Sequence, residues 1–231
     1  MRQNRSKVQS CLMAQGTTSP IMTQKLFDSW AEHYDPAAVS AEDDFPFAGY
    51  ELILDQVINL AGVKPAMRIL DLGIGTGNLA ARFLRQGCLV WGIDFSAKML
   101  AQARAQLPQV NLVQANLLDE WPLTLQQPFD RVVSAYVLHH FDLETKVSLL
   151  RRIATHYLLS SGPILVADIA FPTTSARAEA SRHWAACWDQ DEYYWAADET
   201  IAACEQAGLL VTYKQLSSCG GVFVFTLKGT G

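Results

Sequence analysis

The sequence predicts an α/β protein with a doubly wound sheet of seven strands, mostly parallel and ending in an antiparallel hairpin. Three observations lead to this prediction. Short apolar runs alternate with segments of helical periodicity, a glycine-rich turn follows the first run, and the last two runs lie close together. Alternation of this kind builds a parallel sheet with helices on both faces and right-handed crossovers.

The apolar runs place the strands along the chain. They lie near residues 67–71, 88–94, 110–114, 129–135, 163–169, 209–215 and 221–227. Only five residues, 216–220, separate the last two runs. That gap allows an antiparallel hairpin but no parallel crossover, so the final pair should close one edge of the sheet.

The segment before the first strand predicts two amphipathic helices. Apolar side chains recur at three- and four-residue spacing from Leu26 to Tyr34 and again from Tyr50 to Leu60. We expect a single domain over 23–231, in which residues 23–62 could fold as a lid over a core at 66–231. Residues 1–22 have no acidic side chain and no sustained apolar period, which predicts a disordered leader.

Composition narrows the class of protein. The 231 residues are 50% hydrophobic, enough for one buried core, and the net charge of −5 argues against nucleic-acid binding. No apolar run is long enough to cross a membrane. Five cysteines without a C-x-x-C pair are typical of reduced thiols in a cytoplasmic protein, and we expect no metal site.

The most informative motif is Asp71-x-Gly73-x-Gly75-x-Gly77, at the end of the first strand. Its glycines allow close approach of a ligand, and the next helix begins with free N–H groups. A dinucleotide fingerprint would place its third glycine at Asn78, and a carboxylate would repel a diphosphate. The same carboxylate would attract a cationic ligand such as S-adenosylmethionine. The alternative is a turn that needs glycine only to join strand and helix.

A second acid, Asp94, ends the strand near 88–94. At the tip of a neighbouring parallel strand, its carboxylate can accept hydrogen bonds from both hydroxyls of a ribose. An acid at a strand end often only caps the next helix, a role that Ser96 fills equally well.

Together these segments resemble motif one and its acidic partner in the class I S-adenosylmethionine-dependent methyltransferases. Residues 110–117, 129–140 and 164–168 resemble the third, fourth and fifth strands of that family. Residues 30–35, Trp-Ala-Glu-His-Tyr-Asp, resemble the opening of a bacterial group of small-molecule methyltransferases. The resemblance implies a Rossmann-like fold, S-adenosylmethionine as cofactor and a small-molecule acceptor.

The resemblance also implies which residues contact the cofactor. They are Asp71, Gly73, Gly75, Gly77, Asp94, Phe95, Asn116, Leu117 and Ala135. Asn116 stands where the family commonly carries Asp, and its amide oxygen can still accept a hydrogen bond from the adenine amino group. The turn at 161–163 reads Ser-Gly-Pro in place of paired glycines. Tyr34 could close over the methionine end, or it could be a core aromatic.

Methyl transfer from a sulfonium is an in-line displacement with a neutral leaving group, so alignment can supply much of the acceleration. No catalytic dyad stands out. His139 and His140 follow the fourth strand, and an adjacent pair should point to different sides, so at most one should reach the acceptor. His140 is the candidate general base or polar clamp, whereas a capping or packing role is favoured for His139. Asp168 could hold a cationic acceptor, orient a water or only cap a loop.

An aromatic segment lies between the fifth and sixth strands and comprises Trp184, Trp188, Tyr193, Tyr194 and Trp195. It could line an acceptor pocket, pack on the sheet or form a homodimer face. Neighbouring acids would favour a basic acceptor, or they are only solvated: Asp189, Asp191 and Glu192. A nicotinamide-dependent oxidoreductase is disfavoured by the loop spacing and by Asp71, and a non-catalytic S-adenosylmethionine-binding protein stays open.

Overall fold

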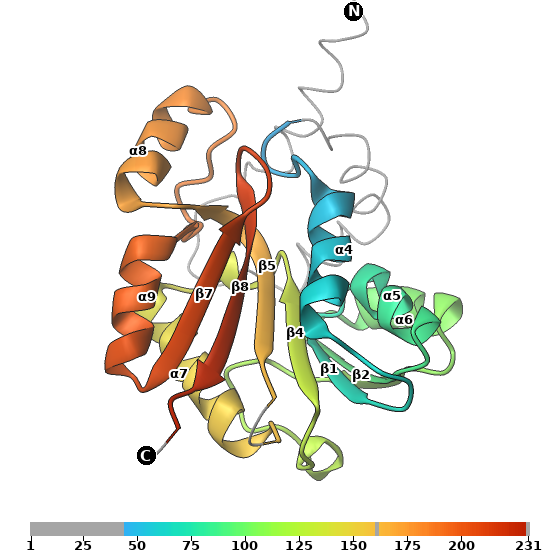
Figure 1. Ribbon diagram of the computed structural model, residues 1–231. Helices are drawn as coiled ribbons and strands as arrows, with labels where there is room; N and C mark the ends of the chain where they lie inside the picture. The colour runs from blue at the N-terminus through green and yellow to red at the C-terminus, as the bar shows by residue number, and fades with distance from the viewer. Residues whose placement is uncertain (1–43, 160–161, 230–231) are drawn as a thin grey trace, which may run out of the picture.

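The computed structural model describes residues 44–159 and 162–229. In this part of the chain, eight strands form one sheet in the order β3-β2-β1-β4-β5-β8-β7, with β6 paired to β5 outside this path (Figure 1). Strands β1 to β5 run parallel, and β8 is antiparallel to both β5 and β7. The predicted doubly wound sheet with an antiparallel C-terminal hairpin is therefore confirmed.

The strands lie within two residues of the predicted positions. They are β1 (Arg68–Leu72), β2 (Leu89–Asp94), β3 (Asn111–Gln114), β4 (Arg131–Ala135), β5 (Ile164–Phe171), β6 (Trp195–Ala196), β7 (Leu209–Gln215) and β8 (Gly220–Leu227). The sequence analysis missed β6, because two residues show no periodicity and this strand depends on its pairing with β5.

Helices connect the strands, and side chains cap several of them. The helices are α4 (Tyr50–Ala61), α5 (Asn78–Arg85), α6 (Ala97–Gln106), α7 (Leu143–His156), α8 (Thr174–His183) and α9 (Ala197–Gln206), with 3-10 turns η1 (Leu123–Leu125) and η2 (Leu138–His140). The Ser96 hydroxyl accepts from the Met99 amide at the start of α6, and the Asp142 carboxylate accepts from the Thr145 amide at the start of α7.

The sheet separates two hydrophobic cores. Successive side chains of β1 alternate between them: Ile69 packs with α4 and α5 on one face, and Leu70 packs with α7 and α9 on the other. Both side chains are fully buried. Burial on both faces explains why the central strands read as continuous apolar runs in the sequence.

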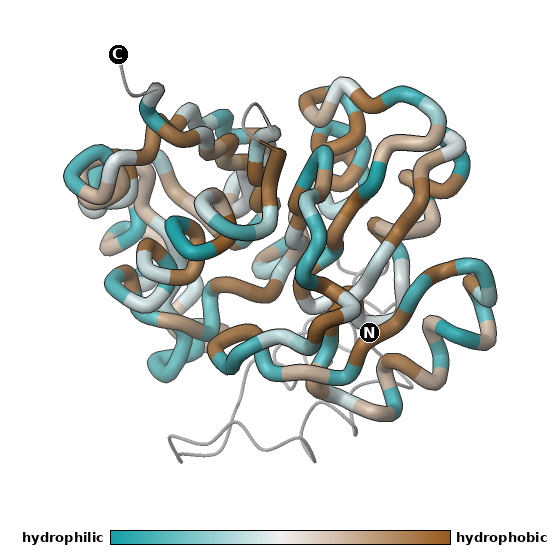
Figure 2. The backbone as a smooth tube through the Cα atoms, turned by 90° about the horizontal axis from the view of Figure 1, so that it is seen from below, coloured by the Kyte–Doolittle hydropathy of each residue, from teal (hydrophilic) through white to brown (hydrophobic). Residues whose placement is uncertain are grey.

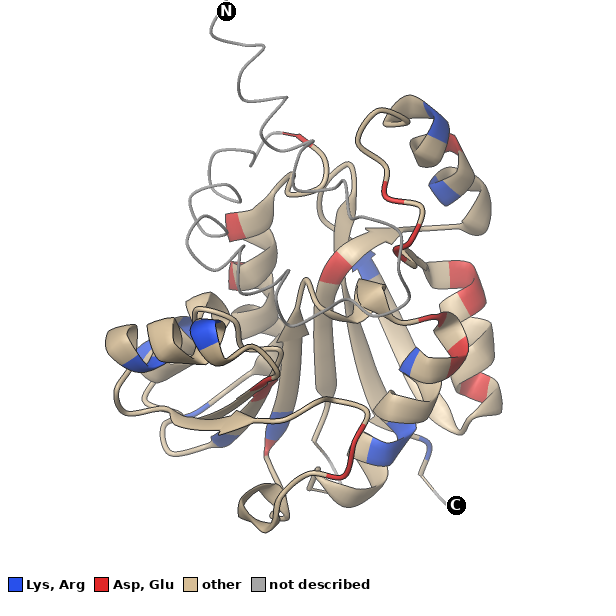
Figure 3. Cartoon of the chain, turned by 180° about the vertical axis from the view of Figure 1, so that it is seen from behind, with Lys and Arg blue, Asp and Glu red and all other residues tan. Residues whose placement is uncertain are grey.

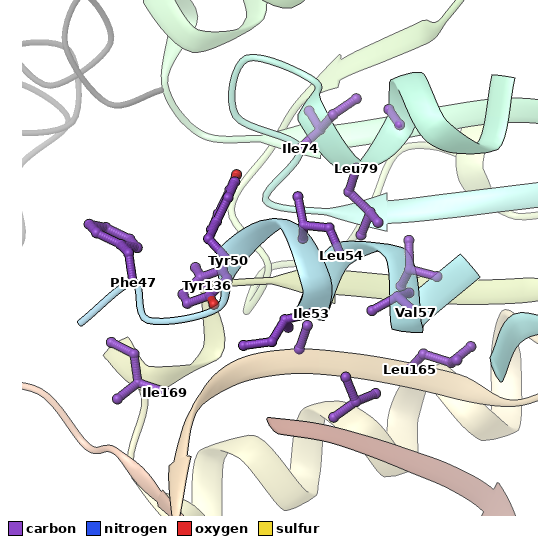
Figure 4. Packing of buried hydrophobic residues seen from close by; sticks show 14 of the residues in the cluster. Phe47, Tyr50, Ile53, Leu54, Val57, Ile74, Leu79, Tyr136, Leu165 and Ile169 are labelled. Carbon is purple, nitrogen blue, oxygen red and sulfur yellow. The ribbon is translucent and has the colours of Figure 1, made fainter. Parts of the chain in front are cut away.

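Helix α4 is the part of the predicted lid that the structure describes. Its side chains Ile53, Leu54 and Val57 are fully buried against β5 and neighbouring strands (Figure 4). Arg82 of α5 binds Glu51 and, at 3.0 Å, Asp55 of α4. These contacts make α4 part of the helical layer on this face. The predicted leader and the helix from Leu26 to Tyr34 lie outside the described residues.

Hydrophobic and hydrophilic residues alternate along the chain (Figure 2), and no helix in the described ranges is long and apolar enough to span a membrane. Lys and Arg residues lie on several separate helices (Figure 3).

Candidate active site

The carboxyl ends of the parallel strands bring the predicted residues to one edge of the sheet. Asp71 lies within β1 beside Val133 of β4, and Asp94 ends β2 next to β1. Ala135 ends β4 beside Ala167 of β5. Ligands of open α/β sheets bind beyond this edge, where the strand order reverses between β1 and β4.

The three glycines of the loop have different surroundings. All have positive φ angles, +66° at Gly73, +55° at Gly75 and +100° at Gly77. A Cβ atom at Gly73 would lie 2.5 Å from the Val137 side chain, and one at Gly77 would lie 2.5 Å from Leu107. Among the described residues, a Cβ atom at Gly75 would meet only the Gly73 carbonyl oxygen, at 4.0 Å. Packing therefore requires two of the glycines, whereas no described side chain packs against the middle one.

The Asp94 carboxylate supports this loop. One oxygen accepts from the Gly75 amide at 2.9 Å, and the other accepts from the Ser96 amide at 2.8 Å. The side chain that caps α6 is the Ser96 hydroxyl, and not the Asp94 carboxylate. These two contacts fix the Asp94 carboxylate directly beside the glycine loop.

Asp71 is a buried carboxylate with one unsatisfied oxygen. It is 1% exposed, and among the described residues its Oδ2 atom has no hydrogen-bond partner. Burial and the nearby charge of Asp94 raise the pKa of Asp71, although an amide hydrogen bond from Ala80 opposes the shift. Two carboxylates in this position disfavour an anion and favour a cation or a hydrogen-bond donor.

The residues expected to contact adenine include one that is more exposed than Asp71 and Asp94. Asn116 follows β3 at the surface, and its Oδ1 atom accepts from the Leu118 amide at 3.0 Å. Leu117 is buried and Phe95 is half-buried. The Asn116 amide thus fixes its own turn, while its NH₂ group can donate outward.

The chain after β4 makes a strained turn. Tyr136 has a φ of +56°, a conformation that a bulky side chain rarely adopts and that often marks a functional site. Its ring packs on Tyr50 and Phe47 of the α4 region, with centroids 5.1 and 5.7 Å away. This turn directs Val137 against Gly73 and carries the chain on to the two histidines.

The expectation that the adjacent histidines point to different sides is wrong. Both lie in η2, their ring centroids are 4.1 Å apart, and both rings approach the carboxylate of Glu192. Successive side chains alternate by half a turn in a strand but by only about a third of a turn in a 3-10 helix. Glu192, which is distant in the sequence, can therefore contact the rings of both His139 and His140.

Asp168 connects this turn to the core. The carboxylate is fully buried and accepts from the His139 amide at 3.0 Å, from the Trp195 indole at 3.0 Å and from the Ile169 amide at 2.9 Å. It also lies 2.6 Å from His139 Nδ1. Asp168 therefore positions the backbone and the ring of His139. The sequence analysis considered other roles for it: holding a cationic acceptor, orienting a water or capping a loop.

The charges in this cluster depend on one another. Burial opposes charge on His139, but Asp168 and Glu192 hold the pKa of His139 at about 10. Burial and the charge of His139 lower the pKa of His140 to about 3, and burial lowers the pKa of Lys146 to about 8. The sequence analysis missed Lys146, which lies 4.1 Å over the Trp195 ring and donates to the Tyr193 carbonyl. A lone lysine on an amphipathic helix gives no sequence signal of burial.

The aromatic segment divides into three parts. Trp184 and Trp188 stack on Phe45 with centroids 5.0 and 5.6 Å away, and Tyr194 meets Phe45 edge-on. Trp195 is buried in the core, whereas Tyr193 is 53% exposed. A surface pocket of about 470 Å³, to which Trp184 contributes, lies between α8 and the β7–β8 turn, away from the glycine loop.

Comparisons with known proteins accord with this geometry. Residues 69–158, from β1 to the end of the α7 region, match the model of a family described as a methyltransferase domain. An uncharacterized methyltransferase of Geobacillus thermodenitrificans is 32% identical over 199 residues, covering 82% of this chain and 90% of that protein. One of Bacillus thuringiensis is 30% identical over 216 residues, covering 89% and 96%.

Solved structures share the fold at lower identity. A complex of DhpI with SAH superposes with a TM-score of 0.68 at 17% identity, over 88% of this chain and 94% of that one. Magnesium protoporphyrin IX methyltransferase of Synechocystis PCC 6803 with bound SAH gives 0.66 at 15% identity, over 90% and 100%. The relatives, which are covered over 90% and 96% of their length, show that this chain belongs to a family of methyltransferases, and the solved structures show that it shares the fold of known methyltransferases.

Proposed function

We propose that this enzyme transfers the methyl group of S-adenosylmethionine to a small-molecule acceptor by in-line displacement. The cofactor contacts would come from Asp71, Gly73, Gly75, Gly77, Asp94, Phe95, Asn116, Leu117 and Ala135. The cofactor supplies a methyl group on a cationic sulfur that leaves as a neutral thioether. The remaining work falls to side chains that bind and orient the reactants.

Two features of the first half of the edge fit this cofactor. The buried Asp71 carboxylate keeps one oxygen without a partner in the described part of the chain, ready for a cationic or N–H group. Among the described residues, the nearest atom to a Cβ at Gly75 would be the Gly73 carbonyl oxygen at 4.0 Å, and the Asp94 carboxylate accepts a hydrogen bond from the Gly75 amide. A hydrogen bond to a charged group contributes about 1.5–3 kcal/mol.

One observation carries the proposal of a small acceptor: the polar groups next to the glycine loop are recessed. Val137, which packs on Gly73, leads directly into His139 and His140, whose side chains are 7% and 14% exposed. Glu192 beside them is 13% exposed. A small molecule can enter to reach such groups more readily than a folded macromolecule can.

His140 serves in this proposal as a hydrogen-bonding clamp. With its pKa lowered to about 3, the imidazole stays neutral at pH 7 and is a weak general base. An acceptor that arrives already deprotonated, such as an amine or a thiolate, would need only alignment.

The first experiment measures cofactor choice. Calorimetric titration of the full chain should show binding of S-adenosylhomocysteine and no heat with NADH. Saturable NADH binding with no response to S-adenosylhomocysteine would refute the assignment of the cofactor residues.

The second experiment measures the acceptor class. The enzyme is incubated with methyl-labelled S-adenosylmethionine and a bacterial extract that has been divided by ultrafiltration. We expect enzyme-dependent label in the small-molecule fraction. Label confined to precipitable protein or RNA would overturn the small-molecule proposal while leaving methyl transfer intact.

A further inference from the structure

Three potential ligand atoms converge at the recessed end of the active-site edge. His139 Nε2 lies 3.5 Å from Glu192 Oε1, and His140 Nδ1 lies 3.6 Å from the same oxygen. All three residues offer ligand atoms within 4.8 Å of one another, and the described part of the chain holds no other such group.

The spacing suits a metal ion better than direct hydrogen bonds. Good N–H···O hydrogen bonds measure about 2.7–3.2 Å, shorter than either contact. A tetrahedral ion with ligands at about 2.0–2.1 Å separates neighbouring ligand atoms by about 3.4 Å. The two printed contacts therefore have nearly the lengths of the edges of a tetrahedral site.

Supporting contacts hold the potential ligands in place. Asp168 occupies the other ring nitrogen of His139 at 2.6 Å, the partner that metal-bound histidines typically have. The His139 backbone is fixed at both ends, because its amide donates to Asp168 and its carbonyl accepts from Tyr193 at 2.7 Å. Tyr194 provides a side-chain hydrogen bond to Glu192.

The types of ligand indicate which class of metal ion would bind. Two imidazoles and one carboxylate suit Zn²⁺ and related first-row ions, whereas Mg²⁺ and Ca²⁺ prefer all-oxygen sites. Three protein ligands leave at least one coordination position open, as in catalytic rather than structural sites. The sequence predicted no metal site because it has no C-x-x-C pair. That argument concerns cysteine ligands and does not apply to a site made of histidines and a carboxylate.

We propose that His139 Nε2, His140 Nδ1 and the Glu192 carboxylate form a binding site for one divalent transition-metal ion of the Zn²⁺ class. Binding displaces any proton from the two ring nitrogens to solvent, and Asp168 keeps the Nδ1 proton of His139 in place. The site stands on this geometry alone and does not depend on the identity of the acceptor.

The test uses the full chain after removal of metals with a chelator. Titration with Co²⁺ should give visible d–d absorption bands of a low-symmetry four- or five-coordinate site, at one equivalent per chain, and Zn²⁺ should displace them. Calorimetry with Zn²⁺ should likewise give one site.

Variants identify the ligands. His140→Ala and Glu192→Gln should each lose the Co²⁺ bands, whereas His156→Ala, at an exposed histidine of α7, should keep them. Asp168→Asn should weaken Zn²⁺ binding by about 10–100-fold. Circular dichroism checks that each variant is folded, and His140→Ala, at a half-buried position, keeps the test valid if Asp168→Asn does not fold.

Two results would overturn the proposal. One is the lack of a stoichiometric Zn²⁺ site in the parent chain. The other is unchanged Zn²⁺ affinity in folded His140→Ala and Glu192→Gln. Binding of S-adenosylhomocysteine is measured on the same samples, so that failure of the metal site is distinguished from failure of the cofactor site.

Discussion

The two halves of the carboxyl edge of the sheet are built in opposite ways. On the β1–β2 side, Asp94 accepts from the amide of Gly75, a Cβ atom at Gly75 would meet no described atom nearer than 4.0 Å, and Asp71 Oδ2 has no partner among the described residues. On the β4–β5 side, the two oxygens of Asp168 receive hydrogen bonds from His139, Ile169 and Trp195. The first half leaves a buried carboxylate oxygen that we propose binds the cofactor, whereas the second half uses its carboxylate to fix other side chains.

This difference predicts where mutations will act. Substitutions that remove a group from the β4–β5 half should reduce stability first, because they leave a buried charge without its partner. Substitutions at Gly75, Asp71 and Asp94 in the β1–β2 half should reduce ligand binding at a smaller cost in stability, whereas Gly73 in the same half is needed for packing. Four predictions, from the largest expected effect to the smallest, test this contrast.

Asp168→Ala should lower the free energy of unfolding by about 3–5 kcal/mol, since it strips a fully buried network of its central acceptor. Urea denaturation of the ligand-free chain measures the effect. Asp191→Ala, at an exposed acid, should change stability by no more than about 0.5 kcal/mol. Equal, small effects of both substitutions would mean that the network contributes nothing to the fold.

Gly73→Ala should cost about 2–4 kcal/mol of stability, because its Cβ atom would lie 2.5 Å from Val137 and its φ is +66°. Gly75→Ala should cost only about 1–2 kcal/mol, from its positive φ alone, and mainly weaken S-adenosylhomocysteine binding. Thermal unfolding and calorimetry on both variants give the comparison. The reverse order of stabilities would contradict the packing role assigned to Gly73.

Asp94→Ala should weaken S-adenosylhomocysteine binding by about 1.5–3 kcal/mol, the scale of hydrogen bonds to a charged group. Asp130→Ala is a matched control, because Asp130 also accepts a backbone amide, that of Arg68 at 2.7 Å, but at the opposite end of the sheet, where β1 and β4 begin. The control should lose stability and keep its affinity. An Asp94→Ala affinity within twofold of the parent would remove Asp94 from the binding site.

Asp71→Asn should stabilise the ligand-free chain at pH 7 by about 1 kcal/mol while weakening cofactor binding, because it removes a buried charge that lacks a full set of partners. The folded-state pKa of Asp71 is raised above 3.8, so the parent loses stability as the pH rises from that value through the raised pKa.

The Asp71→Asn variant does not lose stability in this way, because its side chain does not ionise. The difference in stability between the variant and the parent should therefore grow above pH 3.8 and become constant at higher pH, as measured by melting temperature against pH. An advantage of the same size at every pH would show that the charge of Asp71 is not its cause.

Much of the β1–β2 half could be predicted from the sequence because its signals are local. A glycine at every second position and an acid at a strand end depend on the backbone of one short segment. The strand positions were predictable for a similar reason, since burial on both faces demands continuous apolar runs such as Ile69-Leu70.

The β4–β5 half could not be predicted, because its partners are distant in the sequence. His139 meets Asp168 and Glu192 only after β5 and the aromatic segment have folded beside β4, and Lys146 is buried only by that packing. The sequence alone was sufficient to predict the sheet, the glycine loop and the family of the protein. Tertiary packing decided which charged side chains converge, because no local pattern encodes the contact of a strand end with a segment some 50 residues later.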